Sequence, residues 1–312
     1  MNSQDMLPTF DLFGELRSPQ KQIELTVFHD ERMVSDWLYH AFLIVPNNEL
    51  EEFKKRLADL RVKAECEPTK RVHFYQLTAH STTSTRTMCA KLWAQAYRSE
   101  FFTRSCFYIL GVDLTKIDHG FFGDEDSTRS EEDFRIYNRF FEVGLFGALR
   151  FFYWDYDKRV TAIHTEKRDR EIHDPFLRHP VYAINRRESN MEILCPKIEE
   201  ISPDPAIETQ RRDLTDVLQY VDVIIGAHSQ NLDYSSKTKT GCNEVADVLL
   251  PITDRLVRNP RNRNSRYYRR YSLSFFPRQK ISPNDIDLKV ATQFYNERYI
   301  KRMEKFQPRL ME

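Results

Sequence analysis

The sequence predicts a mixed α/β domain. Two neighbouring β-rich runs open the regular part of the chain, helical and extended patterns then alternate, and no repeat period is present. The chain has 312 residues, of which 40% are hydrophobic, so it can bury a substantial core. Because domains commonly hold about 100–200 residues, this length favours one large domain with an extension.

The first two elements are expected to be strands joined as a hairpin. Apolar side chains alternate from Ile23 to Val27, and this run ends in polar residues at 29–31. Residues 37–45 form a second β-rich run, which Pro46 closes. Since only a short polar link separates the two runs, we expect them to pair.

Helical spacing and turn signals predict the remaining elements. Residues 49–65 have apolar side chains at helical spacing and acids in the first turn, and Asn48 is expected to cap this helix. Further helices are expected at 87–101, about 130–151, 213–230 and 243–250, the last ending just before Pro251. Further extended segments are expected at 72–77, 106–114, 160–166 and around 193–198.

Composition excludes several classes of protein. The 47 basic and 47 acidic residues give a formal net charge of zero, so attraction of nucleic acid by the whole protein is excluded, although a local basic patch is not. The glycines build neither a dinucleotide-binding nor a P-loop motif, and the sequence lacks a GxSxG elbow and an HExxH motif. The five cysteines form no close pair, which suits neither a disulfide framework nor a zinc knuckle.

The hydrophobic pattern predicts a cytoplasmic protein without a membrane partner. No apolar run approaches the roughly 20 residues that span a bilayer. The first 20 residues lack the basic and apolar regions of a secretory signal.

The chain divides into three predicted segments. Residues 1–20 form an N-terminal arm, residues 21–250 the main domain, and residues 251–312 a C-terminal extension. Within the extension, residues 255–280 contain nine Arg or Lys and no acid, interleaved with aromatic residues. This pattern has three interpretations: a nucleic-acid-binding segment, a solvated tail, or an Arg/Tyr-rich protein interface.

Four dispersed residues are candidates for chemistry. Asp30 ends the first strand, Glu166 ends the strand at 160–166, and Asp222 is an isolated acid in an apolar helix. Unpaired, Asp222 would be costly to bury, so a bound cation, an Arg partner in a structural salt bridge, or a helix-capping role elsewhere must compensate it. A turn-forming role is the alternative for Asp30. Together with His73, these acids fall where a sheet edge could gather oxygens for two hard cations such as Mg²⁺.

Three short segments resemble a prokaryotic family of RNase H-like proteins, the domain-of-unknown-function family numbered 3800. The segments are FHDE at 28–31, VHFYQL at 72–77 and LQYVDVIIGA at 218–227, and their order and spacing agree across roughly residues 22–250. In the family they look like a first-strand Asp followed by Glu-Ser-Gly, a Glu-x-His-Phe-type segment and a Leu-Gln-x-Ala-Asp helix.

The chain departs from this family pattern at several positions. Arg32 and Met33 stand where Ser-Gly is usual, and Arg71 replaces the acid before the histidine segment. Glu166 stands where Asp is common. Arg71 is therefore a candidate for contacting phosphate in place of binding metal.

The resemblance implies an RNase H-like mixed sheet flanked by helices, followed by the basic C-terminal extension, and a metal-dependent nuclease of a bacterial defence or toxin-like system. Asp30, Glu166 and Asp222 would hold two Mg²⁺ or Mn²⁺ ions, and His73 would orient or shuttle a proton. The alternative is an inactive RNase H-like subunit that binds nucleic acid or a protein partner in a defence complex.

The basic segment would complement such a site. Its arginines would neutralise phosphates and its tyrosines would stack on unpaired bases. The residues expected in these roles are Arg263, Arg266, Arg269, Arg270, Tyr267 and Tyr268.

Overall fold

The computed structural model describes residues 21–99, 105–122, 126–167, 174–187, 189–232, 239–258 and 270–276. Its strands are β1 (Lys21–Val34), β2 (Trp37–Pro46), β3 (Cys106–Asp113), β4 (Tyr156–Glu166), β5 (Met191–Ile193), β6 (Glu199–Ile201) and β7 (Tyr271–Phe276). Its α-helices are α1 (Asn47–Lys63), α2 (Thr85–Arg98), α3 (Arg129–Phe152), α4 (Asp174–Asn185), α5 (Arg212–Leu232) and α6 (Thr240–Arg258). Short 3₁₀ helices are η1 (Phe74–Gln76), η2 (Leu114–Lys116) and η3 (His119–Phe122).

One mixed sheet forms the centre of the molecule. Within the described residues it has seven strands: six follow the order β5-β4-β1-β2-β3-β7, and the seventh, β6, pairs with β4. The pairs β1–β2 and β2–β3 are antiparallel, whereas β4 runs parallel to β1 and β7 runs parallel to β3. The predicted α/β class is confirmed, as is the predicted hairpin of the first two strands.

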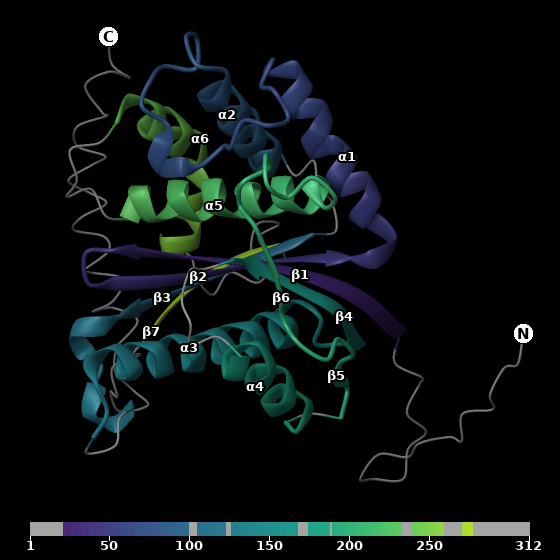
Figure 1. Cartoon of the computed structure of the whole chain (residues 1–312), viewed down its shortest axis with the longest axis vertical. Coiled ribbons are helices and arrows are strands. Elements are labelled where there is room, and N and C mark those ends of the chain that lie inside the picture. Colours follow the sequence, from purple (N-terminus) through teal and green to yellow (C-terminus); the bar gives the residue numbers. More distant parts are fainter. Residues whose placement is uncertain are drawn as a thin grey trace, which may run out of the picture.

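Helices cover both faces of the sheet (Figure 1). On one face lie α1, α2, α5 and α6, and on the other lie α3 and α4. Each face has its own apolar core, because alternate residues of β1 and β2 point to opposite sides. Phe28 joins the α5 side and Val27 the α3 side. On the α5 side, every residue of α5 from Thr215 to Leu232 is buried.

Helix starts differ from the predicted ones where tertiary contacts compete with capping. Asn48 was expected to cap α1, but α1 begins at Asn47, directly after Pro46, without a side-chain cap. The Asn47 side chain instead accepts a hydrogen bond from Thr26 and donates one to Thr161. This helix start is therefore tied to the β1 and β4 strands.

Several other elements differ from the predicted ones. The expected extended segment at 72–77 contains the 3₁₀ turn η1. Helix α4 was not predicted, and it contains Pro180. Helix α6 continues through Pro251 to Arg258, so the segment boundary predicted at residue 250 falls inside this helix. Strand β7, from the predicted extension, pairs with β3 and so belongs to the central sheet.

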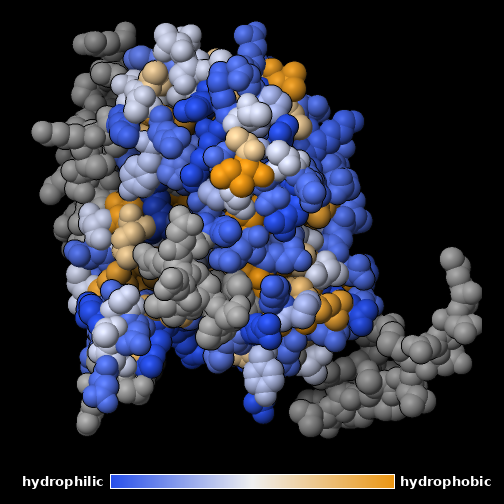
Figure 2. Space-filling view, in the orientation of Figure 1, coloured by the Kyte–Doolittle hydropathy of each residue, from blue (hydrophilic) through white to orange (hydrophobic). Residues whose placement is uncertain are grey.

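The surface is mostly polar on the face shown in Figure 2, where apolar side chains form small separate patches. None of the helices in the described part of the chain combines the length and apolarity that a bilayer span needs.

Gly226 allows the chain around Phe74 to approach α5 closely. A β-carbon at position 226 would overlap the Phe74 ring and come within 2.7 Å of its Cβ. Phe74 itself is fully buried, so its ring has little room to move away. The glycine therefore fixes the distance between η1 and the middle of α5.

We predict that Gly226→Ala lowers the free energy of unfolding by about 1–3 kcal/mol, because it overpacks the core against Phe74. Urea unfolding measures this change. The matched control is Gly147→Ala in α3, where the nearest atom to the added methyl would be the Tyr108 hydroxyl at 3.8 Å. Equal effects of the two substitutions would contradict the prediction.

Candidate functional site at the corner of β1, β4 and α5

The three predicted acids approach one corner of the fold. Asp30 lies on β1, on the face that Phe28 presents to α5. The β1–β4 register pairs His29 with Thr165, which places Glu166 beside Asp30. Asp222 lies in α5 over the same face. The structure thus brings together acids that are far apart in the sequence, at a place where sheet and helix meet.

Residues 71–77, the crossing segment, complete this corner. Asp222 Oδ2 accepts a hydrogen bond from the Phe74 backbone N–H at 2.7 Å. One turn earlier, Gln219 Oε1 accepts a hydrogen bond from the Val72 N–H at 2.9 Å. These two side chains of α5 hold the crossing segment against the helix, and the acid that was expected to bind a cation is paired with a backbone donor.

Arg71 forms an ion pair with Glu166. Its Nη2 lies 2.8 Å from Glu166 Oε1, and both side chains remain partly exposed, at 29% and 24%. Burial raises the pKa of Glu166 from 4.5 to about 7; Arg71 opposes this rise and Asp222 adds to it. The negative charge of Glu166 is therefore opposed by burial and favoured by the guanidinium of Arg71.

His73 is close to Asp222 but not in hydrogen-bonding contact with it. The distance from His73 Nε2 to Asp222 Oδ1 is 3.9 Å. Burial lowers the pKa of His73, Asp222 raises it, and the cations of Arg71, Arg32 and Lys239 lower it. Three cations are therefore near His73 in addition to the acids.

Arg32 is the buried cation of this corner. It follows Asp30 by two residues on β1 and so faces the same side of the sheet. Its guanidinium lies over the rings of Phe74 and Tyr75, 4.7 Å and 4.1 Å from their centroids. The residue is 6% exposed. From the sequence, Arg32 was a departure from the family pattern that favoured the inactive binding subunit, and it was not predicted as a site residue.

The donor set does not fit the two-metal centre that the resemblance implies. Arg71 pairs with Glu166, Asp222 Oδ2 accepts a backbone hydrogen bond, and Asp30 Oδ1 accepts one from the Glu31 N–H. Over the described ranges of the chain, there is no group of three His, Cys, Asp or Glu that could hold a metal ion. The corner contains as many arginine and lysine side chains as carboxylates.

A second buried acid in α5 has a structural role that the sequence did not reveal. Asp216 accepts hydrogen bonds from Arg61 Nη2 and Nε at 2.6 and 3.1 Å, and Arg61 Nη2 also donates to Gln219. The polar residues at 216, 219 and 222 are spaced three apart in a largely apolar helix, and this pattern could have indicated in advance that they share one face and a common role.

The predicted nucleic-acid contacts lie mainly outside the described residues. These are Arg263, Arg266, Arg269, Tyr267 and Tyr268. Arg270 is described: its carbonyl accepts a hydrogen bond from the Phe107 N–H at 2.7 Å, where β7 begins beside β3. The basic segment therefore joins α6 to the edge of the sheet.

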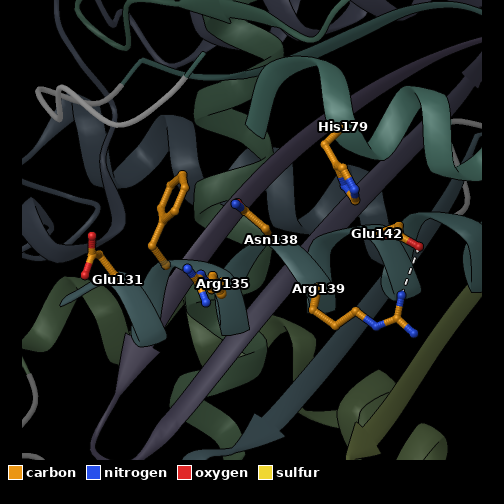
Figure 3. A pocket seen from close by; sticks show the side chains of 7 residues that line it. Glu131, Arg135, Asn138, Arg139, Glu142 and His179 are labelled. Carbon is orange, nitrogen blue, oxygen red and sulfur yellow. Dashed lines mark hydrogen bonds and ion pairs between the residues drawn. The ribbon is translucent and has the colours of Figure 1, made fainter. Parts of the chain in front are cut away.

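A hollow of about 480 Å³ lies away from this corner, lined by one face of α3 and by His179 of α4 (Figure 3). Within it, Glu142 pairs with Arg139 at 3.1 Å, and it also pairs with Arg187. Glu142, an acid of this hollow, is thus already paired within the protein.

Comparisons with known proteins add no assignment. The chain matches no protein-family model, no curated protein sequence and no solved structure. The resemblance described from the sequence therefore stays a prediction.

We predict that Glu166 makes stability fall as pH rises between about 4.5 and 7. Because burial raises the folded-state pKa from 4.5 to about 7, the folded protein binds more protons than the unfolded chain across this range. Glu166→Gln should flatten this slope, measured by urea unfolding at several pH values. The control is Glu192→Gln, an exposed acid on β5, and equal slopes in both variants would contradict the prediction.

Proposed function

We propose that this chain is an RNase H-like nucleic-acid-binding subunit that does not depend on a metal ion at the β1–β4–α5 corner. The single observation that carries the proposal is the ion pair between Arg71 and Glu166. A cation of the protein itself stands where the resemblance implies a metal ion, and it replaces an acid of the family pattern.

The sheet supports the RNase H-like part of the proposal. The resemblance implies a mixed sheet with acids on a first strand, a later strand and a late helix. Here β2 is antiparallel to both β1 and β3, β4 is parallel to β1, and β5 is parallel to β4. Asp30 lies on β1, Glu166 on β4 and Asp222 on α5, which supports this part of the proposal.

The basic segment supports binding of nucleic acid. It starts within α6 and continues beyond β7, so it is attached to the folded domain at both of these elements. Between them lie arginines and tyrosines without an acid. A cationic, aromatic segment of this kind can neutralise phosphates and stack on bases without regard to sequence.

We predict that the protein binds short single-stranded oligonucleotides in EDTA and that binding weakens as salt rises. Replacing Arg263, Arg266, Arg269 and Arg270 by Gln should lower the magnitude of the salt slope by about 0.7 for each phosphate that is no longer neutralised. Fluorescence anisotropy over a salt series measures this slope. A control variant replaces Arg56 and Arg159, which form surface ion pairs, by Gln. Equal slopes in both variants would reject the role of the segment.

A second candidate is the metal-dependent nuclease, using Mg²⁺ or Mn²⁺. The meeting of three carboxylates from β1, β4 and α5 at one corner favours it. It would require Arg71 to release Glu166, since the present contacts leave no common site for a cation among the described residues of the corner.

Incubation with labelled DNA and RNA in Mg²⁺, Mn²⁺ or EDTA separates the two candidates. The main proposal expects retention without cleavage under all three conditions. Cleavage that requires metal and is abolished in Asp30→Asn and in Asp222→Asn, with each variant folded by circular dichroism, would establish the nuclease instead.

A further inference from the structure

We propose that Arg32 and Arg71, together with His73, form a binding site for a phosphate group at the β1–β4–α5 corner. The inference rests on the proposed function, since nucleic acid would supply the phosphate. It goes further by assigning a specific recognition site to residues of the folded domain, separate from the basic segment at 255–280.

The guanidinium of Arg32 is buried with hydrogen-bond donors that are unsatisfied within the described chain. The Nε and Nη1 atoms of its guanidinium are buried, and they have no hydrogen-bond partner among the residues that the structure describes. A buried charged group without hydrogen bonds is unfavourable, and such atoms in a native protein call for a ligand, a water or an ion. The rings of Phe74 and Tyr75 stabilise the cation but accept none of its N–H bonds in the plane of the guanidinium.

Arg71 and His73 present further donors beside it. Arg71 uses Nη2 for Glu166, while its Nε is buried without a partner within the described chain. His73 Nδ1 is likewise buried and unpartnered there. Arg71 and His73 belong to the crossing segment, which α5 holds through Gln219 and Asp222, and Arg32 lies over its Phe74 and Tyr75 rings. The guanidinium N–H groups without partners, and His73 in the tautomer that donates from Nδ1, suit an anion with several acceptor oxygens.

The chemistry of arginine favours phosphate over a metal or an apolar ligand. A guanidinium forms paired hydrogen bonds with a phosphate and keeps its charge at any physiological pH. The acids of the corner do not cancel this preference, because Glu166 is paired with Arg71, while Asp222 and Asp30 accept the N–H groups of Phe74 and Glu31. Lys239 adds a cation, with its Nζ 2.6 Å from the Tyr75 carbonyl oxygen.

The corner is open enough to be reached from solvent. Arg71 and His73 keep 29% and 25% of their side-chain surfaces exposed, and Tyr75, which covers Arg32, is 48% exposed. A phosphate would therefore approach the site from the side on which Arg71, His73 and Tyr75 are partly exposed.

Isothermal titration with inorganic phosphate in EDTA tests the site on the full chain. Arg32→Lys keeps the charge but removes the planar fork, and the double variant Arg71→Gln/Glu166→Gln removes the cation without leaving an unpaired acid. Each is expected to weaken phosphate binding by about tenfold or more. Arg56→Gln, which breaks a surface pair with Glu52, is the control and should leave the affinity unchanged.

A second titration identifies the source of the phosphate. Oligonucleotides with a 5′-phosphate or a 5′-hydroxyl are compared on the same proteins. Tighter binding of the 5′-phosphate that disappears in both corner variants supports a terminal phosphate. Equal binding of the two oligonucleotides that weakens in both variants supports a phosphate of the backbone.

The outcomes for the site and for the proposed function are distinguishable. Absence of phosphate binding, or affinities unchanged in both corner variants, would overturn the site, even if oligonucleotides still bind through the basic segment. Phosphate binding that disappears in the variants, in a protein that binds no oligonucleotide, would support the site and reject the proposed function.

Discussion

The contact between the crossing segment and the middle of α5 is the constraint on which the candidate site depends. Gly226 allows the Phe74 ring to lie against the helix, and Asp222 one turn earlier accepts the Phe74 N–H. These two features fix where residues 71–77 lie along α5. Arg71, His73 and the aromatic cover of Arg32 are all placed by that crossing.

The same contact explains why an acid is tolerated inside an apolar helix. Asp222 is 8% exposed, and a carboxylate at such a depth is costly unless it accepts hydrogen bonds. It shares this role with Gln219 and Asp216, which hold Val72 and Arg61. One polar row of α5 thus organises the backbone of the crossing segment at one end and a buried ion pair at the other.

The corner therefore differs from a cluster of free carboxylates. Its acids are matched by a backbone N–H or a guanidinium, while several nitrogen donors remain without partners in the described structure. Such an imbalance favours an anionic ligand over a cationic one. The basic segment, attached at α6 and at β7, would extend the same preference for phosphate along the molecule.

Alternating hydrophobicity in the sequence by itself determined the α/β class and the hairpin, because strand and helix periods are local properties. The sequence also located the acids Asp30, Glu166 and Asp222, because a single charged residue within or at the end of an apolar run can be recognised without a structure. The sequence could not place Asn47, Arg61 or Arg32, whose partners lie on other elements. Only the tertiary structure decided that Arg71 pairs with Glu166 and that the Phe74 ring fills the space at Gly226. Both contacts depend on strand register and on how closely segments far apart in the sequence pack together.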